Sequence, residues 1–282
     1  MTIGEALRRS RRALSTASDS ADSDARRLAA EAMGESVTWV LAHPEATLSD
    51  AQATWLQQAV ERCARGEPLA YVLGWWEFYG RRFHVTPDVL IPRPETELLV
   101  QQVLDHVRSN PAATEVVDVG TGSGCIAVTL AAEDPRLRLL AVDISRPALK
   151  IARGNARTYE VEERIRWVQA DLLTAFRTGC DVVVANLPYI PRARLAQLEV
   201  ARHEPRPALD GGDDGLSTLR RLVSGLAGVL RPGGFVAMEL DEGQGDSLKS
   251  LLAAAFPRAE IRIGTDLSGL ERFVTLADIG PS

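Results

Sequence analysis

The most constraining feature of this sequence is a short β-branched run that leads directly into a glycine-rich loop. Val116, Val117 and Val119 are interrupted only by Asp118, and residues 120–124 read Gly-Thr-Gly-Ser-Gly. Such runs are typical of buried parallel strands that feed loops at their carboxyl ends, where ligands bind in open α/β sheets. Glycines let the backbone turn sharply and approach a ligand closely. The segment therefore predicts an α/β fold, and its loop is either a nucleotide-binding turn or a plain strand-to-helix turn.

An acidic residue at the end of the next apolar run supports the nucleotide-binding interpretation. Asp143 follows residues 139–142, and a carboxylate at a strand end can accept hydrogen bonds from two ribose hydroxyls. The alternative is that Asp143 only caps the helix that follows it. Both interpretations place this residue at the carboxyl edge of the predicted sheet.

A second segment, Asn186-Leu187-Pro188-Tyr189, follows the apolar run 182–185 and is expected to face the same crevice. The Asn186 side chain can both accept and donate hydrogen bonds, and Pro188 stiffens the backbone so that the Leu187 carbonyl keeps a fixed direction. Tyr189 offers an aromatic face to a planar group. This combination suits a planar NH2 group presented to an electrophile and argues against a nicotinamide cofactor. The alternative is a proline-containing loop without a chemical role.

Together the two segments resemble motifs I and IV of class I S-adenosylmethionine-dependent methyltransferases that act on planar amide or amino nitrogens. That family usually has Asn-Pro-Pro-Tyr, whereas this chain has Leu187 at the second position, and it often has Trp where this chain has Leu172. The resemblance implies S-adenosylmethionine as cofactor and S-adenosylhomocysteine as product. It implies these cofactor-binding residues: Gly120, Thr121, Gly122, Ser123, Gly124, Asp143, Asp171, Leu172 and Asn186. Asp171 is expected at the adenine edge.

The chain is expected to contain three parts. Residues 1–70 predict a small bundle of four short helices, and Ser49 and Gln52 form a capping-box pattern at the start of the fourth. Residues 71–94 predict a linking β-hairpin, and residues 95–282 a catalytic domain in which strands and helices alternate. The expected strands are 115–119, 137–142, 165–169, 181–185, 234–239, 259–264 and 271–276, and the expected helices are 95–109, 124–132, 146–158, 215–230 and 243–255. Seven strands in this order resemble the doubly wound class I methyltransferase sheet, whose last strand is antiparallel.

Residues around the hairpin narrow the resemblance. They are Gly66-Glu67-Pro68, Tyr71, Gly74, Phe78, Gly80, Phe83 and the segment Ile91-Pro92-Arg93-Pro94-Glu95-Thr96-Glu97. This set resembles the family that N5-methylates the glutamine in the Gly-Gly-Gln motif of class 1 peptide chain release factors. The resemblance implies that Asn186 Oδ1 and the Leu187 carbonyl hold the substrate NH2 group, while Pro188 and Tyr189 shape the slot. The helical bundle is then expected to dock the release factor.

Composition narrows the class of protein further. The formal net charge of −6 disfavours stable nucleic-acid binding, because nucleic-acid-binding proteins neutralise phosphates with a basic surface. The three cysteines and four histidines show no metal-ligand spacing, so no metal is expected and a reducing cytoplasm is indicated. No apolar run approaches the ~20 residues that span a bilayer, and residues 1–16 are interpreted as a helix and not as a targeting peptide. We expect a cytoplasmic, monomeric enzyme without membrane contact.

Three alternatives stay open. Asn-Leu-Pro-Tyr is typical of ribosomal RNA adenine dimethyltransferases, so the target could be adenine N6 in RNA or DNA; those enzymes, however, are basic and carry accessory helices after the catalytic domain. The target could also be a glutamine of a ribosomal protein. The third alternative is a scaffold that binds the cofactor without catalysis.

Overall fold

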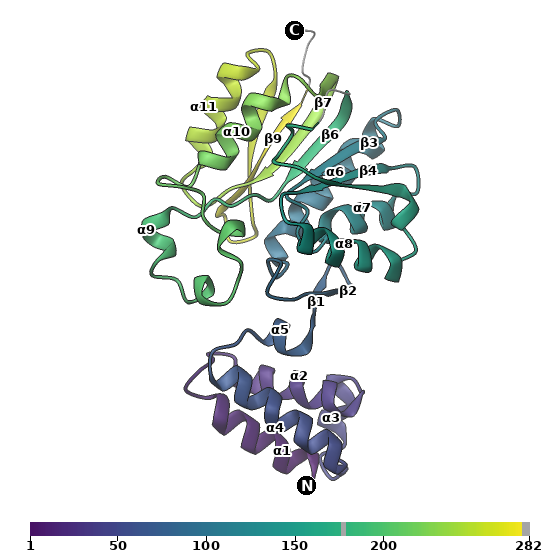
Figure 1. The fold of residues 1–282 in the computed structure, drawn as a ribbon, viewed down its shortest axis with the longest axis vertical. Helices are drawn as coiled ribbons and strands as arrows, with labels where there is room; N and C mark the ends of the chain where they lie inside the picture. Colours follow the sequence, from purple (N-terminus) through teal and green to yellow (C-terminus); the bar gives the residue numbers. More distant parts are fainter. Residues whose placement is uncertain (176–178, 278–282) are drawn as a thin grey trace. The chain divides into compact units, whose positions relative to one another are not determined.

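The computed structural model describes residues 1–175 and 179–277, so the expected end of the catalytic domain, residues 278–282, lies outside the described residues. The chain divides into two compact units, Met1–Trp75 and Trp76–Ser282 (Figure 1). Within the described ranges no helix is both long and apolar enough to cross a bilayer.

The N-terminal unit is helical, as predicted. Its helices are α1 (Ile3–Leu14), α2 (Ala21–Met33), α3 (Val37–Ala42), α4 (Asp50–Ala64) and α5 (Leu69–Leu73). Their apolar faces share one core, whose fully buried members include Ile3, Leu14, Leu28 and Val40. The expected capping box at α4 is present, because the Ser49 hydroxyl accepts from Gln52 N while Gln52 Oε1 accepts from Ser49 N.

The short helix α5 differs from the sequence prediction, and it contains Tyr71, which the sequence assigns to the hairpin segment. Pro68 precedes the helix and Gly74 ends it in the left-handed conformation with φ of 78°. Proline and glycine at these two positions are the ordinary boundaries of a helix, but five residues are too few for a clear periodic pattern. The hairpin itself is shorter than residues 71–94 and comprises β1 (Trp75–Phe78) and β2 (Arg81–His84).

The second unit contains a seven-stranded sheet with the order β5-β4-β3-β6-β7-β9-β8. The strands are β3 (Glu115–Val119), β4 (Arg138–Asp143), β5 (Ile165–Gln169), β6 (Cys180–Ala185), β7 (Leu230–Glu239), β8 (Glu260–Thr265) and β9 (Glu271–Ala277). Strands β3 to β7 pair in parallel, and β9 is antiparallel to both of its neighbours. The predicted seven-stranded α/β sheet with an antiparallel last strand is confirmed.

Helices cover both faces of this sheet (Figure 1). The longer helices of the unit are α6 (Glu97–Ser109), α7 (Cys125–Glu133), α8 (Arg146–Thr158), α10 (Ser217–Leu226) and α11 (Gly245–Ala255). Alternate residues of each strand enter two separate cores, since Val182 and Val184 pack with α6 and α7 while Val183 packs with α10 and α11. Buried parallel strands need apolar residues on both faces, which explains the unbroken valine run of β6.

Two element boundaries differ from the predictions by four residues. Helix α10 ends at Leu226 instead of residue 230, and β7 begins at Leu230 instead of residue 234. The Pro-Gly-Gly sequence at 232–234 suggests a loop, but it forms an irregular part of β7 in which the register to β6 shifts between Cys180 and Val182. A bulge can accommodate glycines within a strand. The turn-forming residues at 232–234 therefore do not mark the start of β7.

Candidate active site

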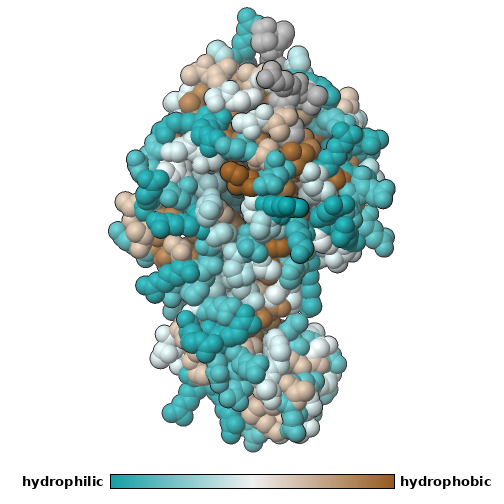
Figure 2. Space-filling view, viewed as in Figure 1, coloured by the Kyte–Doolittle hydropathy of each residue, from teal (hydrophilic) through white to brown (hydrophobic). Residues whose placement is uncertain are grey.

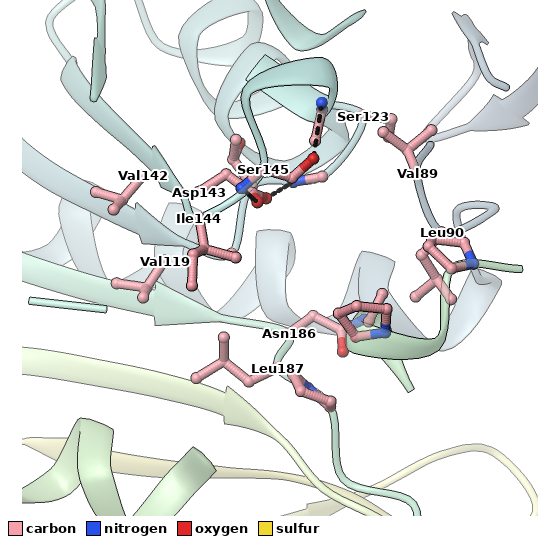
Figure 3. A pocket seen from close by; sticks show the side chains of 18 of the residues that line it. Val89, Leu90, Val119, Ser123, Val142, Asp143, Ile144, Ser145, Asn186 and Leu187 are labelled. Carbon is pink, nitrogen blue, oxygen red and sulfur yellow. Dashed lines mark hydrogen bonds between the residues drawn. The ribbon is translucent and has the colours of Figure 1, made fainter. Parts of the chain in front are cut away.

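A cavity of about 320 Å³ lies at the carboxyl ends of the parallel strands. Figure 3 shows Asp143 and Ser145 on one side of it and Asn186 and Leu187 on the other. The visible surface is mostly hydrophilic, with hydrophobic residues scattered among the hydrophilic ones (Figure 2). The predicted site residues that line the cavity are Gly120, Thr121, Gly122, Ser123, Asp143, Asp171, Leu172, Asn186, Leu187 and Pro188. Gly124 and Tyr189 are not among its lining residues.

The glycine loop is held against the end of β4. Gly120 and Gly122 have φ of 77° and 55°, which only glycine adopts at little cost. Gly122 N donates to Asp143 Oδ2 at 2.9 Å, and Ser145 N donates to Asp143 Oδ1 at 2.8 Å. Burial raises the pKa of Asp143, while these backbone donors oppose that rise. Both carboxylate oxygens are therefore fixed in direction and keep lone pairs for a diol.

Asp118 supports the same loop from beneath. Its Oδ2 accepts from Thr121 Oγ1 at 2.6 Å and from Ala127 N at 3.2 Å, so it joins the loop to the first turn of α7. The side chain is fully buried, and burial raises its pKa to about 7. The sequence showed this residue only as an interruption of the valine run. A carboxyl group in a buried strand is the signal that could have identified it as a loop anchor.

Asp171 and Leu172 line the cavity after β5. Leu172 has φ of 52°, a conformation that is uncommon for a residue with a Cβ and that the surrounding structure must maintain. The Asp171 carboxylate forms an ion pair with Arg221 of α10, which also lines the cavity. Any ligand group that Asp171 binds therefore shares that carboxylate with a guanidinium group.

The Asn186–Tyr189 loop meets the glycine loop directly. A Cβ on Gly120 would lie 2.7 Å from Leu187 Cδ2, so the Leu187 side chain occupies the space that glycine leaves open. Asn186 is half-buried, and its Nδ2 donates to Thr96 Oγ1 at 2.8 Å. The Asn186 amide oxygen and the Leu187 backbone therefore lie beside the loop that was predicted to hold the cofactor.

Tyr189 points to a buried carboxylate and not into the cavity. Its hydroxyl donates to Glu239 Oε1 at 3.0 Å, and Thr96 Oγ1 donates to Glu239 Oε2 at 2.7 Å. Burial raises the pKa of Glu239 to about 7; the two hydroxyl groups and Arg272 oppose the rise, and Glu95 adds to it. Burial beside Glu239 likewise raises the pKa of Tyr189. Sequence reasoning gave no role to Thr96 or Glu239, although Thr96 belongs to a segment that carried the family resemblance.

The second half of the linking segment holds the outer wall of the cavity. Glu204, which is 5% exposed, accepts from Ile91 N at 3.0 Å and forms an ion pair with Arg93. Arg93 lines the cavity, as does Pro205 next to Glu204. A buried carboxylate that is satisfied by a backbone donor and a guanidinium group fixes this wall.

The sheet order and the cavity at its carboxyl edge define a class I methyltransferase. A methyltransferase from Pyrococcus furiosus shares the fold, with a TM-score of 0.53 at 14% identity over 72% of this chain and 91% of that one. Residues 5–74 match the PrmC N-terminal domain, and residues 94–202 match the methyltransferase small domain.

Curated relatives narrow the class to one family. A release factor glutamine methyltransferase of Nitratidesulfovibrio vulgaris is 41% identical over 97% of this chain and 94% of its own length. Another, from Bordetella pertussis, is 44% identical over 88% of this chain and 92% of its own. The chain belongs to the release factor glutamine methyltransferase family, whose methyltransferase fold implies S-adenosylmethionine as methyl donor.

Proposed function

We propose that this protein transfers a methyl group from S-adenosylmethionine to the side-chain amide nitrogen of the glutamine in the Gly-Gly-Gln motif of peptide chain release factors. The observation that carries the proposal is the position of Asn186 and Leu187 beside the glycine loop and Asp143, in one cavity of a chain that belongs to this family. The products are N5-methylglutamine, S-adenosylhomocysteine and the proton that the methylated nitrogen loses to water.

The residues present are suited to this cofactor. Asp143 offers two anchored carboxylate oxygens for the ribose diol, and Ile144 and Leu172 give apolar walls for a planar base. The loop backbone at Gly120 and Gly122 can approach the ligand closely. When bound, S-adenosylmethionine would supply an electrophilic methyl group on a sulfonium.

Asn186 and Leu187 supply acceptors for the nucleophile. An amide nitrogen is a poor nucleophile because its lone pair is delocalised, so its NH2 group must be oriented and its developing positive charge stabilised. Since Nδ2 of Asn186 donates to Thr96, Oδ1 is the amide atom left for the substrate, and the Leu187 carbonyl is the second acceptor that we propose. Preorganised acceptors of this kind stabilise the transition state without a general base.

The helical unit of residues 1–75 forms its own core, and residues 5–74 match the PrmC N-terminal domain. These two observations support our proposal that this part of the chain docks the release factor. The proposed target remains a protein and not a nucleic acid.

Mass spectrometry tests the function directly. Purified release factor is incubated with enzyme and S-adenosylmethionine, and one added methyl group is expected on the glutamine of the Gly-Gly-Gln motif. Ribosomal RNA and ribosomal proteins are treated in parallel. Methylation of RNA or of a ribosomal protein, with none on release factor, would contradict the proposal.

The Asn186→Ala variant tests the site. We expect its kcat to fall by about 10²–10³-fold, the usual loss for one transition-state hydrogen-bond partner, while cofactor affinity changes much less. Asn110→Ala is a matched control, because Asn110 is exposed at the end of α6 and outside the cavity. Turnover of Asn186→Ala close to that of the control would remove Asn186 from the mechanism.

A further inference from the structure

A continuous chain of hydrogen bonds runs behind the proposed nucleophile site. It passes from Asn186 Nδ2 to Thr96 Oγ1 at 2.8 Å, and from Thr96 Oγ1 to Glu239 Oε2 at 2.7 Å. Tyr189 OH closes it by donating to Glu239 Oε1 at 3.0 Å. Thr96 and Glu239 are each 2% exposed, so solvent does not compete for these groups.

The direction of each bond follows from counting hydrogens. When ionised, the Glu239 carboxylate only accepts, so it takes the single hydroxyl hydrogen of Thr96 and that of Tyr189. The Thr96 oxygen can then only accept from its remaining neighbour, and that neighbour must be an N–H group. The Asn186 carboxamide therefore turns its NH2 toward Thr96 and its Oδ1 toward the cavity.

The opposite orientation of the Asn186 amide would be unproductive. The two ends of a carboxamide have almost the same shape, so packing alone selects weakly between them. With the ends exchanged, the NH2 group of Asn186 would face the substrate NH2 group, and two donors would meet. The acceptor that the reaction needs is thus determined by residues that lie behind Asn186.

We propose that Thr96 and Glu239 are positioning residues that fix the orientation of the Asn186 carboxamide, so that Oδ1 accepts from the glutamine NH2 group. This inference rests on the proposed function and adds two residues to it. It also gives a chemical reason for the threonine of the Ile-Pro-Arg-Pro-Glu-Thr-Glu segment, because its single hydroxyl oxygen both donates to Glu239 and accepts from Asn186.

The matched pair Thr96→Val and Thr96→Ser tests the hydroxyl group. Valine keeps the shape of threonine but removes the hydroxyl, so we expect kcat to fall about 10- to 100-fold, as for a lost transition-state contact. KM and the cofactor Kd should change less than about threefold, because ground-state binding is retained. Serine should restore kcat to within about threefold of wild type, since it keeps the donor and the acceptor. Equal kcat values for the two variants would overturn the proposal.

The Glu239→Gln variant tests the direction of the chain. A glutamine that accepts from Tyr189 with Oε1 presents its NH2 group to Thr96, whose hydroxyl must then donate to Asn186 and reverse that amide. In the other placement, the glutamine oxygen accepts from Thr96 and its NH2 group faces Tyr189. The hydroxyl hydrogen of Tyr189 is then left without an acceptor. We therefore expect kcat to fall at least about tenfold, in line with losing a preorganised acceptor.

Adding Asn186→Asp to Glu239→Gln should recover activity. In the double variant Tyr189 donates to Gln Oε1, Gln Nε2 donates to Thr96, and Thr96 donates to the new carboxylate, whose second oxygen faces the cavity. Every partner is satisfied with the chain reversed, so kcat should exceed that of Glu239→Gln by at least about tenfold. A double variant no better than Glu239→Gln would refute the directional argument.

A measurement without substrate separates this inference from the proposed function. In 15N-labelled enzyme the Asn186 side-chain NH2 signals are assigned by their loss in Asn186→Ala. The Nδ2 proton of Asn186 that is bonded to Thr96 should be protected from exchange with solvent in wild type and in Thr96→Ser. The same proton should exchange freely in Thr96→Val. Protection that is the same in all three overturns the inference even if release factor is methylated. Protection as expected, with no methylation by wild type, overturns the proposed function instead.

Discussion

Replacing Gly124 with alanine should destabilise the protein strongly, although this glycine does not line the cavity. Gly124 precedes α7 with φ of 81°, where an L-residue costs about 1–2 kcal/mol. Its added Cβ would lie 2.9 Å from Cβ and 3.1 Å from Cα of Ala152, a fully buried residue of α8. Forcing one extra carbon into a packed contact typically costs about 1–3 kcal/mol. The two effects sum to about 2–5 kcal/mol of unfolding free energy.

Equilibrium urea unfolding measures this loss. Gly154→Ala is the matched control, because Gly154 lies within α8 and a Cβ there meets nothing within 4 Å. Removing a helical glycine should instead stabilise the control by about 0.4–1 kcal/mol. In the double variant Gly124→Ala/Ala152→Gly, the Cβ–Cβ contact disappears, so the two losses should be less than additive. A Gly124→Ala protein within about 0.5 kcal/mol of wild type, the range of neutral surface changes, would refute the packing argument.

Two further predictions concern Asp143 and Glu239. Asp143→Asn replaces an acceptor with a donor beside two backbone N–H groups. Calorimetry should then show that S-adenosylmethionine binds about 10- to 100-fold more weakly, the range for hydrogen bonds to a charged group. Unchanged affinity would exclude the contact between Asp143 and the ribose diol. Burial holds the pKa of Glu239 at about 7, above its ordinary 4.5. The stability that protonated Glu239 contributes is therefore complete below about pH 4.5 and is lost as pH rises through about 7. In contrast, kcat should rise over the same range, because ionised Glu239 only accepts hydrogen bonds from Thr96 and Tyr189. The kcat profile and urea unfolding against pH, compared with Glu239→Gln, should show both trends weakened in the variant.

The sequence predicted the sheet because its strands carry a strong local signal. β3 and β6 are nearly continuous β-branched runs, and each ends in residues that cannot continue a strand pairing, a glycine loop after Val119 and an Asn-Leu-Pro turn after Ala185. Since parallel strands bring their carboxyl ends to one edge, the sequence alone predicts that the two loops lie at one cavity. Both line the cavity that the structure contains.

Side-chain partners could not be predicted, because they depend on register and on segments far apart in the chain. Asn186 and Thr96 are 90 residues apart, and Thr96 and Glu239 are 143 residues apart. An aromatic residue after Asn-Leu-Pro suggested a wall of the substrate slot, but the structure directs the Tyr189 hydroxyl to Glu239. Periodicity also does not reveal that Leu187 fills the space above Gly120, since that contact joins two different loops.

The segment from Ile91 to Glu97 connects these observations. Ile91 N and Arg93 bind Glu204 on the outer wall, Thr96 binds Glu239 and Asn186 at the inner wall, and Glu97 Oε1 accepts from Tyr79 N of the hairpin at 2.7 Å. A segment that only linked two parts of the chain would need stiffness, which its prolines supply, but not these particular acids, hydroxyl and guanidinium groups. Arg93 and Thr96 of this segment line the cavity, and each is bonded to a buried carboxylate. The polar side chains of this segment are therefore explained by their contacts at the site. Substitutions of these side chains should lower turnover more than they lower the stability of the fold.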